Sequence, residues 1–224
     1  MLKGQGLLTP LQRAFIQAFA ELFDQQHFFL TGGTALTEFY LAHRVSFDLD
    51  FFTSEEALIV PFSYQVTALA DTYPFQVEVV RRFATYVEFL ITQDTETLKV
   101  DLAFDSPFRF ATPLISEYGV WVNPFEDLRV DKLLAYYGRA EPRDAVDLYF
   151  ILQREPLAPL LDLAVQKDPG FDLYWFAVAL NRATDFPDDL ARWPVKMLKP
   201  IVPVDVKSLF KDIALDIMAR LAKP

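Results

Sequence analysis

The stretch Phe47-Asp48-Leu49-Asp50-Phe51 alternates apolar and acidic residues, the pattern of a β-strand with one buried face. Alternate residues of a strand share a face, so we expect Asp48 and Asp50 on one side of the strand and the apolar residues on the other. The backbones of the two acids are then about 6–7 Å apart, so both carboxylates can reach one ion. Their mutual repulsion and lost hydration favour a bound cation that prefers oxygen ligands, such as Mg²⁺ or Mn²⁺. The alternative is a solvated pair of acids on an edge strand.

A further acid lies on a later predicted strand, residues 98–104. Polar and apolar residues alternate there, so Asp101 is expected on the polar face together with Lys99. With Asp48 and Asp50, Asp101 can hold two metal ions about 3.5–4 Å apart for phosphoryl or nucleotidyl transfer. It can also accept the proton of an attacking hydroxyl. The alternative is a half-exposed strand acid.

A glycine turn between a predicted strand and a predicted helix precedes the paired acids, at residues 30–34 (LTGGT). Gly32 and Gly33 let the backbone approach a ligand closely, and the first amides of the helix can bind phosphate oxygens. Thr34 either caps that helix or adds a hydroxyl contact. Arg44 is expected to steady the loop before the acids or to contact a phosphate. Any tight turn also explains a Gly-Gly pair, and the chain has no Walker A or G-x-G-x-x-G pattern.

Cations and acids with helical spacing lie in the second half of the chain. Lys132 and Arg139 are seven residues apart, so they share one face of a predicted helix and can meet a triphosphate there. The next predicted helix begins near Arg143 and Asp144 and carries Asp147 one turn further on. The two acids can orient Lys132 or help to bind a nucleotide. The alternative is ordinary helix chemistry, in which first-turn acids favour the helix dipole and Arg143 pairs with Asp147.

The periodicity predicts two domains, an α+β domain at residues 1–122 and an all-helical domain at residues 123–224. The predicted strands are residues 28–30, 47–53, 75–82, 86–92 and 98–104. The predicted helices are residues 10–23, 34–42, 64–72, 173–182 and 208–221, and three others are expected to begin at Pro124, Pro142 and Pro156.

The composition narrows the class of protein. The chain has 224 residues, 52% of them hydrophobic, so it is long enough to bury a core. Cysteine is absent and there are only two histidines, which excludes disulfides and thiolate sites and makes a histidine-built zinc site improbable. No apolar run approaches the ~20 residues of a membrane-spanning helix, and no secretory signal is evident, so we expect a cytoplasmic protein.

Charge constrains the partners. The net charge of −10 disfavours non-specific nucleic-acid binding and suits a site that gathers divalent cations. Residues 190–224 nevertheless hold 7 basic and 3 acidic groups. A local RNA-docking patch can therefore form from Lys196, Lys199, Lys207, Lys211 and Arg220.

The order of these motifs resembles that of the AbiEii/AbiGii toxin family, a branch of the DNA polymerase β-like nucleotidyltransferase superfamily. The resemblance covers about residues 28–152. It rests on G-G-T-A-L at 32–36, R-x-S-x-D-x-D-F at 44–51, Asp101, K-L-L-A at 132–135 with Arg139, and R-D-x-x-D-L at 143–148.

The resemblance implies the roles of single residues. By it, Gly32 and Gly33 open the nucleotide site and Asp48 and Asp50 are metal ligands. Lys132 contacts the nucleotide. The second essential acid, in the helical part, is Asp144 or Asp147.

The resemblance also implies a fold and an activity. The fold is a polymerase β-like nucleotidyltransferase domain with a mixed sheet, followed by a helical domain. The activity is Mg²⁺- or Mn²⁺-dependent transfer of a nucleoside monophosphate from an NTP to an acceptor hydroxyl, with release of pyrophosphate. Acceptors in relatives include the 3′ ends of tRNAs, and a cognate antitoxin is usually encoded nearby. The chain is thus expected to act as the toxin of a toxin–antitoxin or phage-defence pair.

Two alternatives remain open. The acceptor can instead be a small molecule or a protein hydroxyl, which the net charge of −10 suits better. The chain can also be a catalytically silent relative that binds a partner. The presence of Asp48, Asp50 and Lys132 speaks against a silent relative.

Overall fold

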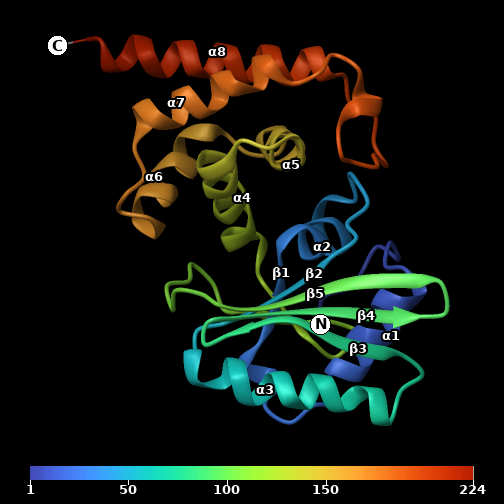
Figure 1. Ribbon diagram of the computed structural model, residues 1–224. Helices are drawn as coiled ribbons and strands as arrows, with labels where there is room; N and C mark the ends of the chain where they lie inside the picture. Colours follow the sequence, from blue (N-terminus) through green and yellow to red (C-terminus); the bar gives the residue numbers. More distant parts are fainter. Residues whose placement is uncertain (224) are drawn as a thin grey trace. The chain divides into compact units, whose positions relative to one another are not determined.

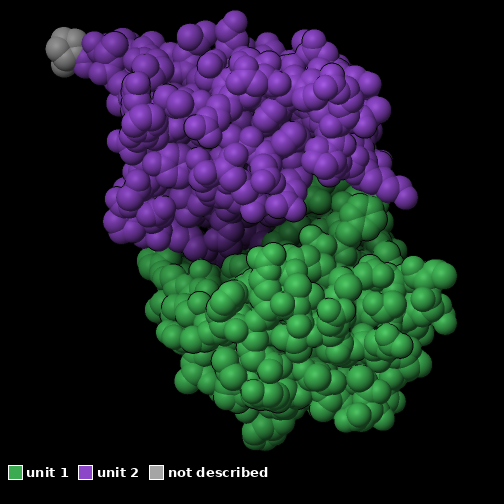
Figure 2. Space-filling model, viewed as in Figure 1, with its two compact units in different colours: residues 1–125 green, residues 126–224 purple. Residues whose placement is uncertain are grey.

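The chain forms two compact units, which Figure 2 distinguishes by colour: unit 1, residues 1–125, and unit 2, residues 126–224. The computed structural model describes residues 1–223. The sequence predicts the division between residues 122 and 123. No helix among these described residues is long and apolar enough to cross a membrane.

The elements of unit 1 are a mixed sheet with the helices that pack on it. The helical segments are α1 (Pro10–Phe19), η1 (Gln25–His27), α2 (Gly32–Leu36), η2 (Thr37–Leu41), α3 (Glu56–Ala68) and η3 (Leu69–Asp71). The strands are β1 (Phe29–Thr31), β2 (Leu49–Thr53), β3 (Gln76–Phe83), β4 (Tyr86–Gln93), β5 (Glu96–Phe104), β6 (Leu114–Ile115) and β7 (Trp121–Val122).

Unit 2 is helical throughout its described residues. Its elements are α4 (Phe125–Arg139, which begins at the last residue of unit 1), α5 (Pro142–Leu152), α6 (Leu157–Lys167), α7 (Leu173–Asn181), η4 (Arg182–Asp185), η5 (Leu190–Arg192) and α8 (Pro203–Leu221). Helices α7 and α8 pack against each other (Figure 1). The buried Tyr136 of α4 joins them: its ring packs edge-on to Phe210 of α8, and its hydroxyl donates to the Ala179 carbonyl at 3.1 Å.

The sheet of unit 1 has the strand order β3-β4-β5-β2-β1-β7-β6 among the described residues. Strand β2 lies in its interior, antiparallel to β1 and parallel to β5 (Figure 1). The expected strands therefore exist and belong to one mixed sheet, which confirms the predicted α+β fold class.

Helices α1 and α3 cover one face of this sheet (Figure 1). Phe51 of β2 points to that face and stacks on Phe19 of α1, with ring centroids 3.9 Å apart. Phe28 stacks in the same way on Phe62 of α3, at 4.1 Å. These four rings are fully buried, so the face that they occupy is the hydrophobic core. Asp50, next to Phe51 in the strand, points to the opposite face, which we call the polar face.

Several predicted boundaries are wrong. The expected helix 34–42 is a short α2 followed by the π-helical segment η2, in which the Ala42 amide bonds the Thr37 carbonyl five residues back. Apolar spacing does not distinguish a wide turn of this kind from a regular helix. The strand expected at residues 47–53 begins at Leu49, because Phe47 is exposed and Asp48 lies just before the ladder.

Two helices begin earlier than predicted, and each has a proline in the part that lies before the predicted start. Helix α3 begins at Glu56 rather than residue 64, and Pro61 lies inside it. Helix α8 begins at Pro203 rather than residue 208, with proline in its first turn. The N-terminal helix has the expected cap at Thr9 but ends at Phe19 rather than residue 23.

The buried carboxylate of Glu38, in η2, holds the N-terminal segment onto unit 1. It accepts hydrogen bonds from the amides of Gly6 and Leu7 at 3.0 and 2.7 Å and from the Tyr118 hydroxyl at 2.7 Å. Burial, followed by this hydrogen bond, raises the pKa of Tyr118 to about 12, so the hydroxyl remains a donor at neutral pH. One side chain thus fixes two distant segments.

Replacing Glu38 with alanine is expected to lower the free energy of unfolding by about 3 kcal/mol, because donors to a buried charged acceptor lose their partner. The control is Glu117→Ala, since Glu117 is exposed and accepts one bond, from the Gly4 amide. That change should cost less than about 1 kcal/mol. Urea denaturation of both variants measures the difference, and equal effects would contradict the role given to Glu38.

Candidate active site

A row of polar residues crosses the polar face of the sheet at one level of the strand register. The register pairs Arg81 with Glu88, Glu88 with Asp101, Asp101 with Asp50, and Asp50 with Thr31. We call these five residues the polar row. Asp50 and Asp101 are direct neighbours in it, because β2 and β5 pair in parallel. The two acids that the sequence places on separate strands therefore lie side by side.

The carboxylate of Asp50 lies directly against the backbone of Gly32. Gly32 has φ +68°, and a Cβ built there would overlap the carboxylate oxygen and lie 2.8 Å from Cγ of Asp50. Both the backbone conformation and the space therefore require glycine. Gly33 is similarly close: its Cβ would lie 2.7 Å from an Arg44 nitrogen and from the Ser46 hydroxyl. The groups that the structure places against this turn are the protein's own side chains, and the predicted approach to a ligand stays a prediction.

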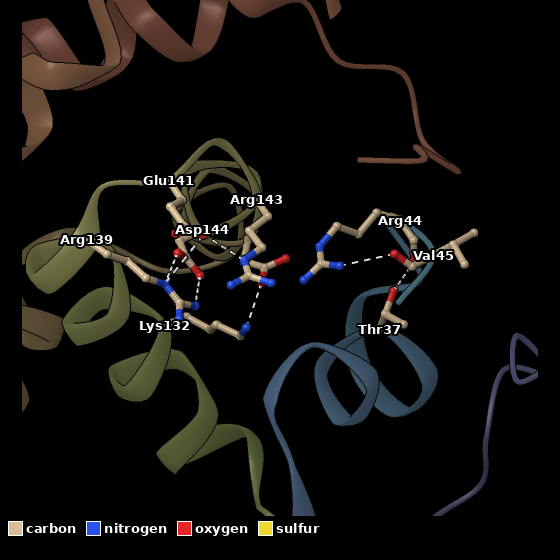
Figure 3. A network of polar contacts seen from close by, with 9 residues as sticks. Thr37, Arg44, Val45, Lys132, Arg139, Glu141, Arg143 and Asp144 are labelled. Carbon is tan, nitrogen blue, oxygen red and sulfur yellow. Dashed lines mark hydrogen bonds and ion pairs between the residues drawn. The ribbon is translucent and has the colours of Figure 1, made fainter. Parts of the chain in front are cut away.

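Thr34 and Arg44 fix the loop that carries the acids. The buried Thr34 hydroxyl donates to the Asp48 carbonyl at 2.5 Å and does not cap α2. Arg44 is buried as well, and its guanidinium donates to the Val45 carbonyl at 3.1 Å (Figure 3). Thr37 donates to the carbonyl of Arg44, as the same figure shows. Of the two roles expected for Arg44, these contacts correspond to steadying the loop.

Asp101 already has a cation beside it. The Lys99 ammonium is 2.5 Å from Oδ2 of Asp101, and the Tyr86 hydroxyl donates to Oδ1 at 2.9 Å. Burial alone would lower the pKa of Lys99, but its hydrogen bond to Asp101 and the charges of Asp101, Asp48 and Asp50 raise it overall. Lys99 therefore lies within the electrostatic reach of all three acids that were predicted as metal ligands.

The donor set fits a divalent cation at the paired acids. Asp48 and Asp50 are partly exposed carboxylates, and hard cations such as Mg²⁺ prefer such oxygen ligands. The Gly32 backbone leaves the space in which the Asp50 carboxylate lies. Within residues 1–223, however, no three His, Cys, Asp or Glu side chains are gathered as a metal centre. Asp101 is instead engaged by Lys99 and Tyr86 at both of its oxygens.

Two ion pairs join α4 to α5 in unit 2, and in each the acid is fully buried. Lys132 lies 2.8 Å from Asp147, and their side chains are 8% and 0% exposed. Arg139 binds Asp144 with two hydrogen bonds, of 2.5 and 2.7 Å (Figure 3). Asp147 thus orients Lys132, one of the roles expected for it.

Arg143 does not make the pair with Asp147 that ordinary helix spacing suggests. Its guanidinium donates to Glu141, one residue before α5, at 2.9 Å (Figure 3). Asp147 points instead to Lys132, on the neighbouring helix. The i,i+4 rule is overridden here because a buried carboxylate takes the cation that is buried with it.

Sequence reasoning missed the contacts that Lys99 and Tyr86 make with Asp101. For Lys99 the signal was available, because Lys99 and Asp101 are two residues apart on a strand and therefore share a face. For Tyr86 it was not, because its contact with Asp101 depends on the pairing of β4 with β5.

Comparisons with known proteins identify a family for the chain. The model of the family described as "Nucleotidyl transferase AbiEii toxin, Type IV TA system" matches residues 14–213. No curated protein matches the chain in sequence.

Three solved structures share the fold. A protein of H. pylori described as a candidate nucleotidyltransferase is 20% identical, with a TM-score of 0.63, over 94% of this chain and 93% of that chain. JHP933 from Helicobacter pylori is 18% identical, with a TM-score of 0.59, over 94% and 90%. MenT4, a nucleotidyltransferase toxin from Mycobacterium tuberculosis, is 17% identical, with a TM-score of 0.63, over 93% and 82%.

The change Gly32→Ala is expected to lower the free energy of unfolding by more than the ~1–2 kcal/mol of left-handed backbone strain, because the new Cβ also displaces the Asp50 carboxylate. Gly6→Ala is the matched control, since Gly6 has φ +76° and no atom within 4 Å of a built Cβ. Chemical denaturation measures both variants. If Gly32→Ala costs no more than Gly6→Ala, the close contact with Asp50 is not a constraint.

Breaking the buried pair through Lys132→Met or Asp147→Leu alone is expected to cost about 3–5 kcal/mol, because a buried charge is left uncompensated. The double variant Lys132→Met/Asp147→Leu should regain most of that loss, since it buries two apolar side chains instead. Thermal and urea denaturation of the three variants form a double-mutant cycle. Additive losses in the double variant would contradict the pairing.

Proposed function

The chain belongs to the AbiEii family of nucleotidyl transferase toxins, and we propose that it uses Mg²⁺ or Mn²⁺ to move a nucleoside monophosphate from an NTP to an acceptor hydroxyl. Family membership, which the sequence analysis predicted, makes it a nucleotidyltransferase. The observation that carries the finer proposal is the pair Asp48 and Asp50, with the Asp50 carboxylate held against the backbone of Gly32. Such a pair suits an ion that also binds phosphate oxygens.

We assign the metal-binding role in unit 1 to Asp48 and Asp50. A divalent ion there would neutralise phosphate charge and polarise the α-phosphorus for attack. Thr34 holds the backbone of Asp48, and Gly32 leaves room for the carboxylate of Asp50. The backbone at Gly32 and Gly33 is the proposed opening of the nucleotide site.

The transfer needs a group that takes a proton. The acceptor oxygen bonds to the α-phosphorus, the bond from that phosphorus to the oxygen bridging to the β-phosphate breaks, and pyrophosphate leaves. The hydroxyl proton then passes to a base, a role that we assign to Asp101. We do not assign Asp101 as a ligand of a second metal ion, because the Lys99 ammonium is already in contact with its carboxylate.

We assign the nucleotide contact in unit 2 to Lys132, held in place by Asp147. A cation that is already oriented loses little freedom when it meets a phosphate. Arg139, held by Asp144, and Arg143 are the further proposed phosphate contacts; their side chains are about half exposed, at 45% and 44%. The 8% exposure of Lys132 means that a phosphate reaches only the end of its side chain.

We further propose that the acceptor is the 3′ end of a tRNA and that the chain acts in the cytoplasm as the toxin of a toxin–antitoxin or phage-defence pair. Family membership supports a cognate antitoxin, and the basic segment 190–224 supports RNA docking. Two of its cations are partly compensated, because Lys207 pairs with Asp188 and Arg220 with Asp216. The net charge of −10 supports the second candidate, a small-molecule or protein acceptor.

Incubation with each α-labelled NTP, Mg²⁺ and total RNA tests the proposal. We expect a labelled band of tRNA size, absent with the variant Asp48→Asn/Asp50→Asn, which removes the charges that would hold the ion. Asp94→Asn is the matched control and should label RNA normally, because it removes a similar charge from the exposed turn between β4 and β5, where φ is +52°, outside the polar row.

Each other outcome of the assay has a meaning. Pyrophosphate release without labelled RNA indicates a small-molecule or protein acceptor. No NTP binding by calorimetry indicates a catalytically silent relative. Labelling that persists in Asp48→Asn/Asp50→Asn contradicts the assignment of the two acids.

A further inference from the structure

The Lys99 ammonium is a positive charge of the protein itself that lies among the carboxylates proposed for catalysis. This ammonium is 2.5 Å from Asp101, which neighbours Asp50 in the polar row. Lys99 and Asp48 each come one residue before the first pair of the parallel register, Leu49 with Val100. Lys99 therefore lies on the strand that carries Asp101 and beside the start of the strand that carries Asp50.

Hydrogen bonds fix the position of the Asp101 carboxylate, and the Asp101 carboxylate in turn fixes the Lys99 ammonium. The Tyr86 hydroxyl lies 2.9 Å from Asp101 and 3.1 Å from Glu88, so its single proton is within hydrogen-bond distance of both carboxylates and is closer to Asp101. Glu88 in turn lies 3.7 Å from Arg81 at the edge strand. Asp101 thus has a donor at each oxygen, one of them charged. This is the arrangement of a carboxylate that anchors a cation of the protein itself.

The net negative charge of the polar row, Asp48 and Lys99 equals the charge that one divalent ion neutralises. The polar row and its two flanking residues contain four acids, Asp48, Asp50, Glu88 and Asp101, and two cations, Arg81 and Lys99. The net charge of these six residues is −2. A single divalent ion neutralises that excess, whereas a second ion would meet the ammonium of Lys99 beside Asp101.

We propose that Lys99 is a positioning residue that takes the place of a second metal ion, so that the site binds a single divalent cation at Asp48 and Asp50. This inference rests on the proposed metal-binding role of those two acids. Lys99 acts through Asp101: it blocks metal ligation by that carboxylate and supplies the positive charge that a second ion would otherwise bring.

The test is Mn²⁺ titration of the full chain by isothermal calorimetry, with no nucleotide present. The natural chain is expected to bind one Mn²⁺, and Asp48→Asn/Asp50→Asn none. Lys99→Met, which removes the charge and keeps a long side chain, is expected to bind two, with the first site about tenfold tighter because a repelling charge is gone. Lys99→Arg keeps the charge and is expected to bind one. Lys3→Met, elsewhere in unit 1, is the control and should also bind one.

The outcomes separate the inference from the function it rests on. One Mn²⁺ in both the natural chain and Lys99→Met, at equal affinity, overturns the inference and leaves the paired-acid site intact. Two Mn²⁺ in the natural chain also overturn it. No Mn²⁺ binding by the natural chain overturns both claims. If Lys99→Met does not fold by circular dichroism, Lys99→Gln removes the same charge and is titrated in its place; one Mn²⁺ at the affinity of the natural chain then overturns the inference.

Discussion

The close packing of the Asp50 carboxylate on the Gly32 backbone is the contact on which the site of unit 1 depends. It requires the left-handed conformation of Gly32 at the end of β1 and the antiparallel pairing that places Thr31 beside Asp50. Because β2 lies between β1 and β5, the same placement puts Asp50 next to Asp101. A side chain at position 32 would therefore disturb the turn after β1, the Asp50 carboxylate and the polar row together.

The molecule has 31 acidic and 21 basic residues, and several of its acidic side chains are neutralised by neighbouring cations. Three of its buried acids are each held by one cation: Asp147 by Lys132, Asp144 by Arg139 and Asp101 by Lys99. Pairs of this kind add little net stability compared with apolar residues, but they fix the direction of each side chain. A nucleotidyltransferase needs fixed charges, since its catalysis is largely positioning and electrostatic stabilisation.

Much of this arrangement follows from local patterns in the sequence. The alternation around Asp48 and Asp50 predicts a strand with one acidic face. The glycine pair predicts a backbone that approaches a ligand closely, and the structure shows that Gly32 also leaves space for the Asp50 carboxylate. The orientation of Lys132 by Asp147 was among the predicted roles, because both lie on faces set by helical spacing. The family was predicted as well, from the order of the motifs.

The spacing of residues in the sequence does not show how strands align with one another, or which of several oppositely charged residues a side chain pairs with. The neighbour of Asp101 depends on how three strands align, so its engagement by Tyr86 was not foreseen. Arg143 has two acids within reach, and only the buried pair of Asp147 with Lys132 decides between them. The assigned roles of Asp101, Lys132 and the other proposed catalytic residues stay predictions.

The central claim is that Asp48 and Asp50 bind the catalytic metal ion. Anomalous diffraction from crystals of the full chain, grown with Mn²⁺ and a non-hydrolysable NTP analogue, tests it most directly. We expect a manganese peak about 2.1 Å from carboxylate oxygens of both acids and in contact with the phosphates of the analogue. A peak elsewhere, with neither Asp48 nor Asp50 as a ligand, would contradict it.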